Sequence, residues 1–208
     1  MNANNSLKLR IFTLGNGQVG KTCFILRFTE DSFQPAHLMT TGIDLKTKLV
    51  ELNNKKYNVS FYDTAGQERF RSICYNSIKS ADGIILMFDL TNQKSYDEIS
   101  NWMMNIKDIK GDDFPMILIG NKCDLEKERV ISKEEGIELS KKYKLKYFEA
   151  SNKTGENIQE SGTSIISLVI EARDRKMKEA AKDFEVIEKF ELEKTKTFKK
   201  KKHKMCKK

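Results

Sequence analysis

One stretch decides the fold, Gly15-Asn16-Gly17-Gln18-Val19-Gly20-Lys21-Thr22, which fits the pattern G-x-x-x-x-G-K-[ST]. An apolar run typical of a strand precedes it, and a helical pattern follows it. Such a loop points backbone N–H groups at phosphate oxygens, and the helix dipole adds partial positive charge. We expect Lys21 to reach terminal phosphates and the Thr22 hydroxyl to bind Mg²⁺, which prefers oxygen. The Lys-Thr pair disfavours the alternative, a glycine turn that only connects strand to helix.

Outward from this loop, short apolar runs alternate with longer amphipathic stretches. This alternation predicts an α/β fold with a mostly parallel six-stranded sheet, one antiparallel edge strand and helices on both faces. Asn53-Asn54 predicts the turn of the antiparallel hairpin. The expected strands are residues 8–14, 43–52, 56–62, 83–90, 116–120 and 146–149, and the expected helices are residues 21–29, 95–110, 132–143 and 158–175.

In such sheets ligands bind beyond the carboxyl ends of the strands. After Tyr62 comes Asp63-Thr64-Ala65-Gly66-Gln67-Glu68. Asp63 is expected to hold Mg²⁺ through a water, and Gly66 to offer its N–H to a γ-phosphate oxygen. Gln67 is the candidate to orient the attacking water. The alternative is a solvated turn.

Two residues near the phosphates need separate comment. Thr40, in Thr40-Thr41-Gly42-Ile43-Asp44, is the candidate threonine that joins the magnesium shell when a γ-phosphate is present. Threonine is also common at strand starts, which is the alternative. Gln18 stands where glycine adopts positive φ more easily, so we expect reduced affinity or rigidity rather than lost binding.

Base specificity is predicted from Asn121-Lys122-Cys123-Asp124 and Ser151-Asn152-Lys153, each of which follows an expected strand. An aspartate carboxylate accepts two hydrogen bonds, which suits N1–H and the 2-amino group of guanine, and adenine lacks that pair of donors. The Lys122 stem is expected to pack on the base plane, and backbone N–H groups of residues 151–153 to approach the guanine oxygen. An ordinary surface turn is the alternative for residues 121–124.

Together these motifs resemble the small GTPase superfamily and, within it, the Rab family, over residues 7–175. The Rab resemblance rests on Gly42-Ile43-Asp44, on Gln67-Glu68-Arg69-Phe70-Arg71-Ser72 and on Leu86-Met87-Phe88-Asp89-Leu90-Thr91. It implies the P-loop NTPase fold of small GTPases, bound GTP or GDP with Mg²⁺, and regulation of vesicle transport. It also implies exchange factors, GTPase-activating proteins and effectors as partners.

The resemblance carries over to this chain residue by residue. It implies Gln67 as the catalytic residue, Thr22, Thr40 and Asp63 as metal ligands, and Phe33 as the aromatic at the guanine edge. The implied nucleotide-binding residues are Gly15, Asn16, Gly17, Gln18, Val19, Gly20, Lys21, Thr22, Cys23, Phe33, Thr40, Asp63, Gly66, Asn121, Lys122, Asp124, Ser151, Asn152 and Lys153.

The chain departs from the Rab pattern at its effector positions. Leu45, Tyr62 and Ser77 stand where Rabs usually present a Phe-Trp-Tyr triad, and Ser77-Ile78-Lys79-Ser80-Ala81 replaces Tyr-Tyr-Arg-Gly-Ala. We therefore expect a different choice of effector. Asn152 replaces the usual alanine, which is a mild change if backbone contacts dominate.

We expect a short extension at residues 1–6, a GTPase domain at 7–175 over the range of the resemblance, and a charged helical or disordered extension at 176–208. The net charge of +8 comes from nine lysines between Lys194 and Lys208, since the remainder has 29 basic and 30 acidic residues. A near-neutral body argues against nucleic-acid binding, and the tail predicts attraction to an anionic membrane. The alternative is a solvated tail.

The protein is expected to be a monomer. It is expected to be cytoplasmic and to lie partly on the cytosolic face of an endomembrane or the plasma membrane. The four cysteines, Cys23, Cys74, Cys123 and Cys206, match no zinc site or disulfide framework. No apolar run is long enough to span a bilayer. Met205-Cys206-Lys207-Lys208 is neither a cysteine pair nor a C-a-a-X ending, which leaves lipidation of Cys206 open.

The expected reaction is hydrolysis of GTP to GDP and phosphate. It is expected to be slow, because no motif marks an arginine finger in the chain itself and a partner's arginine adds roughly 10³–10⁵ in rate. Within the superfamily, a small GTPase of a non-Rab branch is an alternative to a Rab. Among other functions, a GTP-loaded scaffold with negligible hydrolysis is the first alternative. A kinase that uses ATP is the second, and residues 121–124 oppose it.

Overall fold

The computed structural model describes residues 7–33, 43–64 and 78–205, with side chains for residues 7–33, 44–64 and 78–182. Its strands are β1 (Leu7–Leu14), β2 (Ile43–Leu52), β3 (Lys55–Thr64), β4 (Gly83–Asp89), β5 (Met116–Asn121) and β6 (Lys146–Ala150). Its helices are α1 (Lys21–Glu30), α3 (Gln93–Asp97), α4 (Ile99–Lys110), α5 (Lys133–Tyr143) and α6 (Ile158–Met205), with a short 3₁₀ turn η2 (Glu126–Glu128).

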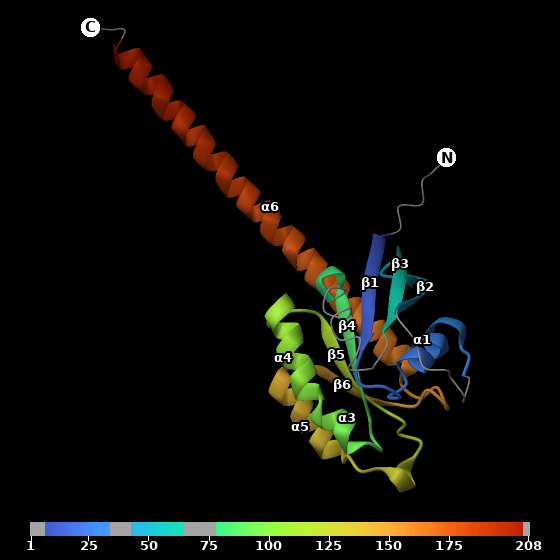
Figure 1. Cartoon of the computed structure of the whole chain (residues 1–208). Coiled ribbons are helices and arrows are strands. Elements are labelled where there is room, and N and C mark those ends of the chain that lie inside the picture. The colour runs from blue at the N-terminus through green and yellow to red at the C-terminus, as the bar shows by residue number, and fades with distance from the viewer. Residues whose placement is uncertain (1–6, 34–42, 65–77, 206–208) are drawn as a thin grey trace, which may run out of the picture. The chain divides into compact units, whose positions relative to one another are not determined.

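The six strands form one sheet in the order β2-β3-β1-β4-β5-β6 (Figure 1). Only the edge strand β2 runs antiparallel to its neighbour, and the other four pairings are parallel. The predicted mostly parallel α/β sheet with one antiparallel edge strand is confirmed. The hairpin turns at Asn53 (φ 51°) and Asn54 (φ 59°), where asparagine tolerates the left-handed backbone that two-residue hairpins require.

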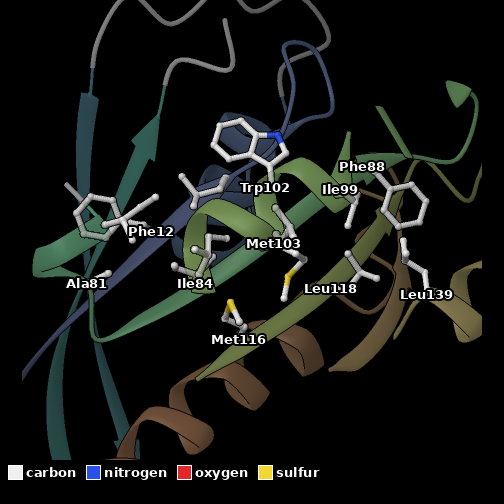
Figure 2. Packing of buried hydrophobic residues seen from close by; sticks show 14 of the residues in the cluster. Phe12, Ala81, Ile84, Phe88, Ile99, Trp102, Met103, Met116, Leu118 and Leu139 are labelled. Atoms are coloured by element: carbon white, nitrogen blue, oxygen red, sulfur yellow. The ribbon is translucent and has the colours of Figure 1, made fainter. Parts of the chain in front are cut away.

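Apolar side chains cover both faces of the sheet. On one face, Trp102 and Met103 of α4 and Leu139 of α5 join a buried cluster with Ile84 and Leu118 of the central strands (Figure 2). On the other face, the Phe28 ring of α1 packs edge-on against Phe61 of β3, with ring centroids 5.2 Å apart. A methyl group on Gly162 of α6 would collide with that Phe28 ring, so the two helices approach closely there.

The sequence prediction was wrong about residues 95–110, which were expected to form one helix. The helical region begins at Gln93, and Glu98 separates α3 from α4. The earlier start has a local cause, because the Asn92 side chain accepts a hydrogen bond from the Ser95 N–H at 3.2 Å and caps the helix.

The last helix extends beyond the predicted end near residue 175, since α6 continues to Met205. The chain divides into two compact units, Met1–Val169 and Ile170–Lys208, and the division falls within this helix. Side chains from Arg173 to Lys182 are exposed. In the part of the chain that the structure describes, no helix combines the length and apolarity that crossing a membrane would require.

Arg129 ties the loop after β5 to strand β6. Its guanidinium donates to both carboxylate oxygens of Glu149, at 3.0 and 2.9 Å, and to Glu126 at 2.9 Å. The hydrogen bond with Glu149 raises the pKa of Arg129, so the guanidinium stays charged. Both side chains of the pair are less than one-fifth exposed, at 17% and 16%. Such paired, geometrically fixed charges are among the stronger polar contacts in a fold.

Glu149→Gln should lower the free energy of unfolding by about 2 kcal/mol, because the amide loses the charge that holds two Arg129 hydrogen bonds. Urea unfolding followed by circular dichroism measures this. The matched control is Glu128→Gln at an exposed position of η2, which should change stability by less than about 0.5 kcal/mol. Equal midpoints for the two variants would contradict the assignment.

Candidate functional site

The loop between β1 and α1 contains three residues with positive φ, two of which are glycines. Gly15, Gln18 and Gly20 have φ of 138°, 63° and 99°. A side chain on Gly15 would collide with the backbone oxygen of Met87 in β4, and one on Gly20 would collide with two asparagine amides. Glycine is therefore required at both positions. Gln18 adopts the left-handed conformation foreseen for it, at an exposed place where a non-glycine residue costs on the order of 1–2 kcal/mol.

Lys21, at the first turn of α1, arches back over this loop. Its ammonium donates to the carbonyl oxygens of Gly15 at 3.0 Å and Asn16 at 2.7 Å, and the residue is only 5% exposed. A buried ammonium needs such acceptors because desolvation of a charge is costly. The positive charge is thereby held at the loop where the sequence predicts phosphates.

A hydroxyl and a carboxylate meet beside this lysine. The Thr22 hydroxyl of α1 donates to a carboxylate oxygen of Asp63, at the end of β3, over 2.6 Å. Asp63 is 3% exposed. Burial raises the pKa of the neighbouring Cys23 thiol, and the negative charge of Asp63 raises it further, so the thiol stays protonated.

The oxygen pair fits magnesium, which is typically held by one or two protein oxygens together with phosphates and waters. Among the residues that the structure describes, no group of three or more His, Cys, Asp and Glu side chains forms an independent metal cage. The donor set is therefore compatible with a metal that arrives with a phosphate ligand and is poorly suited to a metal bound by protein alone.

Two asparagine amides join the loops after β5 and β6, where the sequence predicts base specificity, to the loop between β1 and α1. The Asn121 amide donates to the Val19 carbonyl at 2.8 Å, and the Asn152 amide donates to the Gly20 carbonyl at 2.9 Å. Both residues are nearly fully buried, with 1% and 5% exposure. Two loops that each lie more than a hundred residues along the chain from the phosphate loop are thus held within hydrogen-bond distance of it.

The two base-specificity loops also contact each other. The Ser151 hydroxyl donates to a carboxylate oxygen of Asp124 at 2.6 Å, and the Cys123 N–H donates to the Ala150 carbonyl at 3.1 Å. Burial, with Glu156 nearby, raises the pKa of the Cys123 thiol to about 12, so Cys123 is a protonated packing residue. Asp124 is thereby tied to the loop after β6.

The remaining predicted site residues are placed as follows. Gly17 and Lys153 are exposed, and Phe33 is half-buried after α1. Thr40, Gly66 and Gln67 lie outside the described residues.

At the predicted effector positions, Leu45 on β2 pairs across the hairpin with Tyr62 on β3. Leu45 is 50% exposed. The Tyr62 ring stacks on Phe12 with centroids 4.3 Å apart. Ser77 lies outside the described residues.

Sequence reasoning missed two contacts at the site. The Trp102 indole of α4, which lies in the cluster of Figure 2, donates to the Asn16 side-chain oxygen at 3.1 Å and fastens the phosphate loop to the core. Asp89, at the end of β4, pairs with Lys122 at 2.6 Å. An acid at the end of a buried strand is the signal that identified Asp63, and it applied to Asp89 equally. Nothing in the local sequence marked the contact between Trp102 and Asn16.

Comparison with known proteins identifies the family of this chain. The model of the Ras family matches residues 10–171. Ras-related protein Rab-8B of Bos taurus is 40% identical over 171 residues, which covers 82% of this chain and 83% of that protein. Ras-related protein Rab-13 of Canis lupus familiaris is 41% identical over 156 residues, covering 75% and 77%. Ras-related protein Rab-3A of Homo sapiens is 40% identical over 162 residues, covering 78% and 74%. The chain therefore belongs to the Ras family, as a Rab-like small GTPase that binds and hydrolyses GTP and acts as a switch in vesicle transport.

Proposed function

We propose that this switch holds its guanine nucleotide and Mg²⁺ in the pocket formed by the phosphate loop, the end of β3 and the loops after β5 and β6. The observation that carries the proposal is the pair of buried amides, Asn121 and Asn152, that donate to consecutive carbonyls of the phosphate loop. The ribose links the base of a nucleotide covalently to its phosphates over a limited distance, so a site for it must hold its base-binding and phosphate-binding loops close together.

The phosphates are bound by the backbone N–H groups of residues 15–22 and by Lys21. The contacts of Lys21 with the carbonyls of Gly15 and Asn16 support this role, because they keep the ammonium over the loop before ligand arrives. Pre-organised charge stabilises the developing charge of phosphoryl transfer without reorganisation at the moment of reaction.

Magnesium is held by Thr22 directly and by Asp63 through a water, with Thr40 added when a γ-phosphate is present. When bound, the metal neutralises negative charge on the phosphate oxygens. The hydrogen bond between Thr22 and Asp63 keeps both oxygen groups oriented toward one point, which supports this assignment.

Guanine is recognised by the Asp124 carboxylate, with the Lys122 stem against the base plane and backbone N–H groups of residues 151–153 at the guanine oxygen. Phe33 lies at the edge of the base. The Ser151 hydroxyl fixes the Asp124 carboxylate, and a fixed acceptor discriminates better than a mobile one because the wrong base leaves it unpaired.

Hydrolysis requires Gln67 to orient water, and the rate rises when an activating protein supplies further charge. As a Rab-like GTPase the chain works with exchange factors, activating proteins and effectors. Leu45 and Tyr62 form part of the effector surface in this proposal. The half-exposed leucine in place of an aromatic ring favours a partner other than those of aromatic-triad Rabs.

The tail is the proposed membrane contact. Residues 7–175 act as the GTPase domain and residues 176–208 as its extension, on a monomer located partly at the cytosolic face of an endomembrane or the plasma membrane. Nine lysines between Lys194 and Lys208 supply the attraction, at about 1 kcal/mol for each lysine near an anionic surface.

Gln67→Leu should slow single-turnover GTP hydrolysis at least about tenfold, because leucine cannot hydrogen-bond the attacking water. Phosphate release after rapid mixing with Mg²⁺ measures the rate, and GDP affinity should stay unchanged. If wild type and variant hydrolysed GTP at equal rates, Gln67 would lose its role. If wild type released no phosphate over many hours, the scaffold alternative would replace a catalytic function.

Asp124→Asn should weaken GDP binding by about 100-fold, because the amide replaces a charged acceptor of two hydrogen bonds. Isothermal titration of nucleotide-free protein with Mg²⁺ and GDP or ADP measures this. Asp113→Asn is the matched control at an exposed position and should bind GDP like wild type. A wild-type protein that bound ADP as tightly as GDP would contradict the guanine site.

Replacing Lys199, Lys200, Lys201 and Lys202 by glutamine should weaken binding to vesicles containing about one third phosphatidylserine by about 1000-fold, at about 1 kcal/mol for each lysine. Replacing the same four residues by arginine is the matched control and should preserve binding, because the charge is kept. Co-sedimentation at low and high salt measures both. Equal binding by the glutamine and arginine variants would contradict an electrostatic role for the tail.

A further inference from the structure

Asp89 is a buried carboxylate that none of the roles above uses. It ends strand β4 and is 4% exposed. A buried carboxylate is expensive unless charges and hydrogen bonds compensate it, so its partners indicate what it is kept for.

The backbone around Asp89 is fixed from two sides. Its register partner on β5 is Asn121, so Asp89 lies beside the first residue of a base-specificity loop. Its N–H donates to the Ser95 hydroxyl at 2.9 Å, and Ser95 is itself buried in the first turn of α3. The backbone that carries the Asp89 carboxylate is therefore held in a fixed position.

The two carboxylate oxygens have separate tasks. One accepts from the Thr91 N–H at 2.9 Å and from the Thr91 hydroxyl at 2.8 Å. The other lies 2.6 Å from the Lys122 ammonium. Thr91 sets the rotation of the carboxylate, and the carboxylate presents its remaining oxygen to the lysine.

Lys122 is the residue that this arrangement constrains. Its backbone has φ 68°, a left-handed conformation that a lysine adopts only when its surroundings hold it there. Its side chain is one-third exposed, at 34%, whereas that of Asp89 is 6% exposed. The Lys122 ammonium is thus held by the buried Asp89 carboxylate. Because the backbone and the ammonium of Lys122 are both held, few rotamers remain for its methylene stem.

We propose that Asp89 is a positioning residue for base recognition, which holds the Lys122 ammonium so that the lysine stem is set in place before guanine binds. The inference rests on the proposed function, because it assumes the guanine site at residues 121–124. Pre-ordering the side chain removes an entropy cost from binding, so its loss appears mainly as faster nucleotide release.

A double-mutant cycle tests this proposal with the full-length protein loaded with a fluorescent methylanthraniloyl GDP. Release is followed by stopped flow after excess unlabelled GDP and Mg²⁺ are added. Asp89→Asn should speed release about tenfold, a loss of about 1.4 kcal/mol. Lys122→Met keeps an apolar stem without the charge, and in that background Asp89→Asn should change release less than about twofold, since the tethered group is gone.

A purely structural role of Asp89 predicts a different result. Equal acceleration by Asp89→Asn in both backgrounds would show that Asp89 acts on the fold and would overturn the proposal, as would the absence of acceleration in the wild-type background. Asp97→Asn is the matched control, an exposed aspartate in α3, and should leave release unchanged.

A second variant keeps the test informative if Asp89→Asn does not fold. Thr91→Val removes the hydroxyl that orients the carboxylate but leaves the Asp89–Lys122 pair in place, and it should speed release about threefold only when Lys122 is present. The proposed function fails separately, if wild-type protein does not retain the labelled GDP against excess ADP. If wild-type protein retains the labelled GDP against excess ADP but Asp89→Asn does not change GDP release, only the inference about Asp89 is refuted.

Discussion

The hydrogen bonds from Asn121 and Asn152 to the phosphate loop hold the site together. The Gly20 carbonyl that accepts from Asn152 also accepts the Phe24 N–H, which is one of the first hydrogen bonds of α1. One backbone group therefore links the start of the helix, the phosphate loop and the loop after β6. Glycine at position 20 is the condition for this contact, because any side chain there would collide with both amides.

Carboxylates near the carboxyl end of the sheet are each paired with a hydroxyl or a cation. Asp63 meets Thr22, Asp89 meets Lys122 and Glu149 meets Arg129, each within 3 Å. Each of these acids is the last or the second-to-last residue of its strand, where a rigid backbone can hold a carboxylate in one orientation. The cost of desolvating each group is offset by its partner, and the same pairing leaves the site pre-organised for a charged ligand.

Membership of the Ras family accounts for the chemistry of a GTP-hydrolysing switch, and Leu45 and Tyr62 stand at two of the positions where the sequence departs from the Rab pattern. Leu45 presents half of its surface beside Tyr62, whose ring is stacked flat on Phe12. Asn152 is a departure of a different kind, because its side chain adds a hydrogen bond to the Gly20 carbonyl of the loop before α1.

Short-range spacing in the sequence was sufficient to predict the glycine-rich loop after β1, the alternation of strands and helices along the chain, and the hairpin turn at Asn53-Asn54. These features depend on backbone conformations that neighbouring residues impose. Resemblance then supplied the roles of residues such as Gln67, which lies outside the described residues. Only the tertiary structure decided that Asp89 faces Lys122, that Trp102 reaches Asn16 and that Asn152 reaches Gly20. Those contacts depend on the register of adjacent strands and on how helices pack over them, and no local pattern encodes which side chains meet across such distances in the chain.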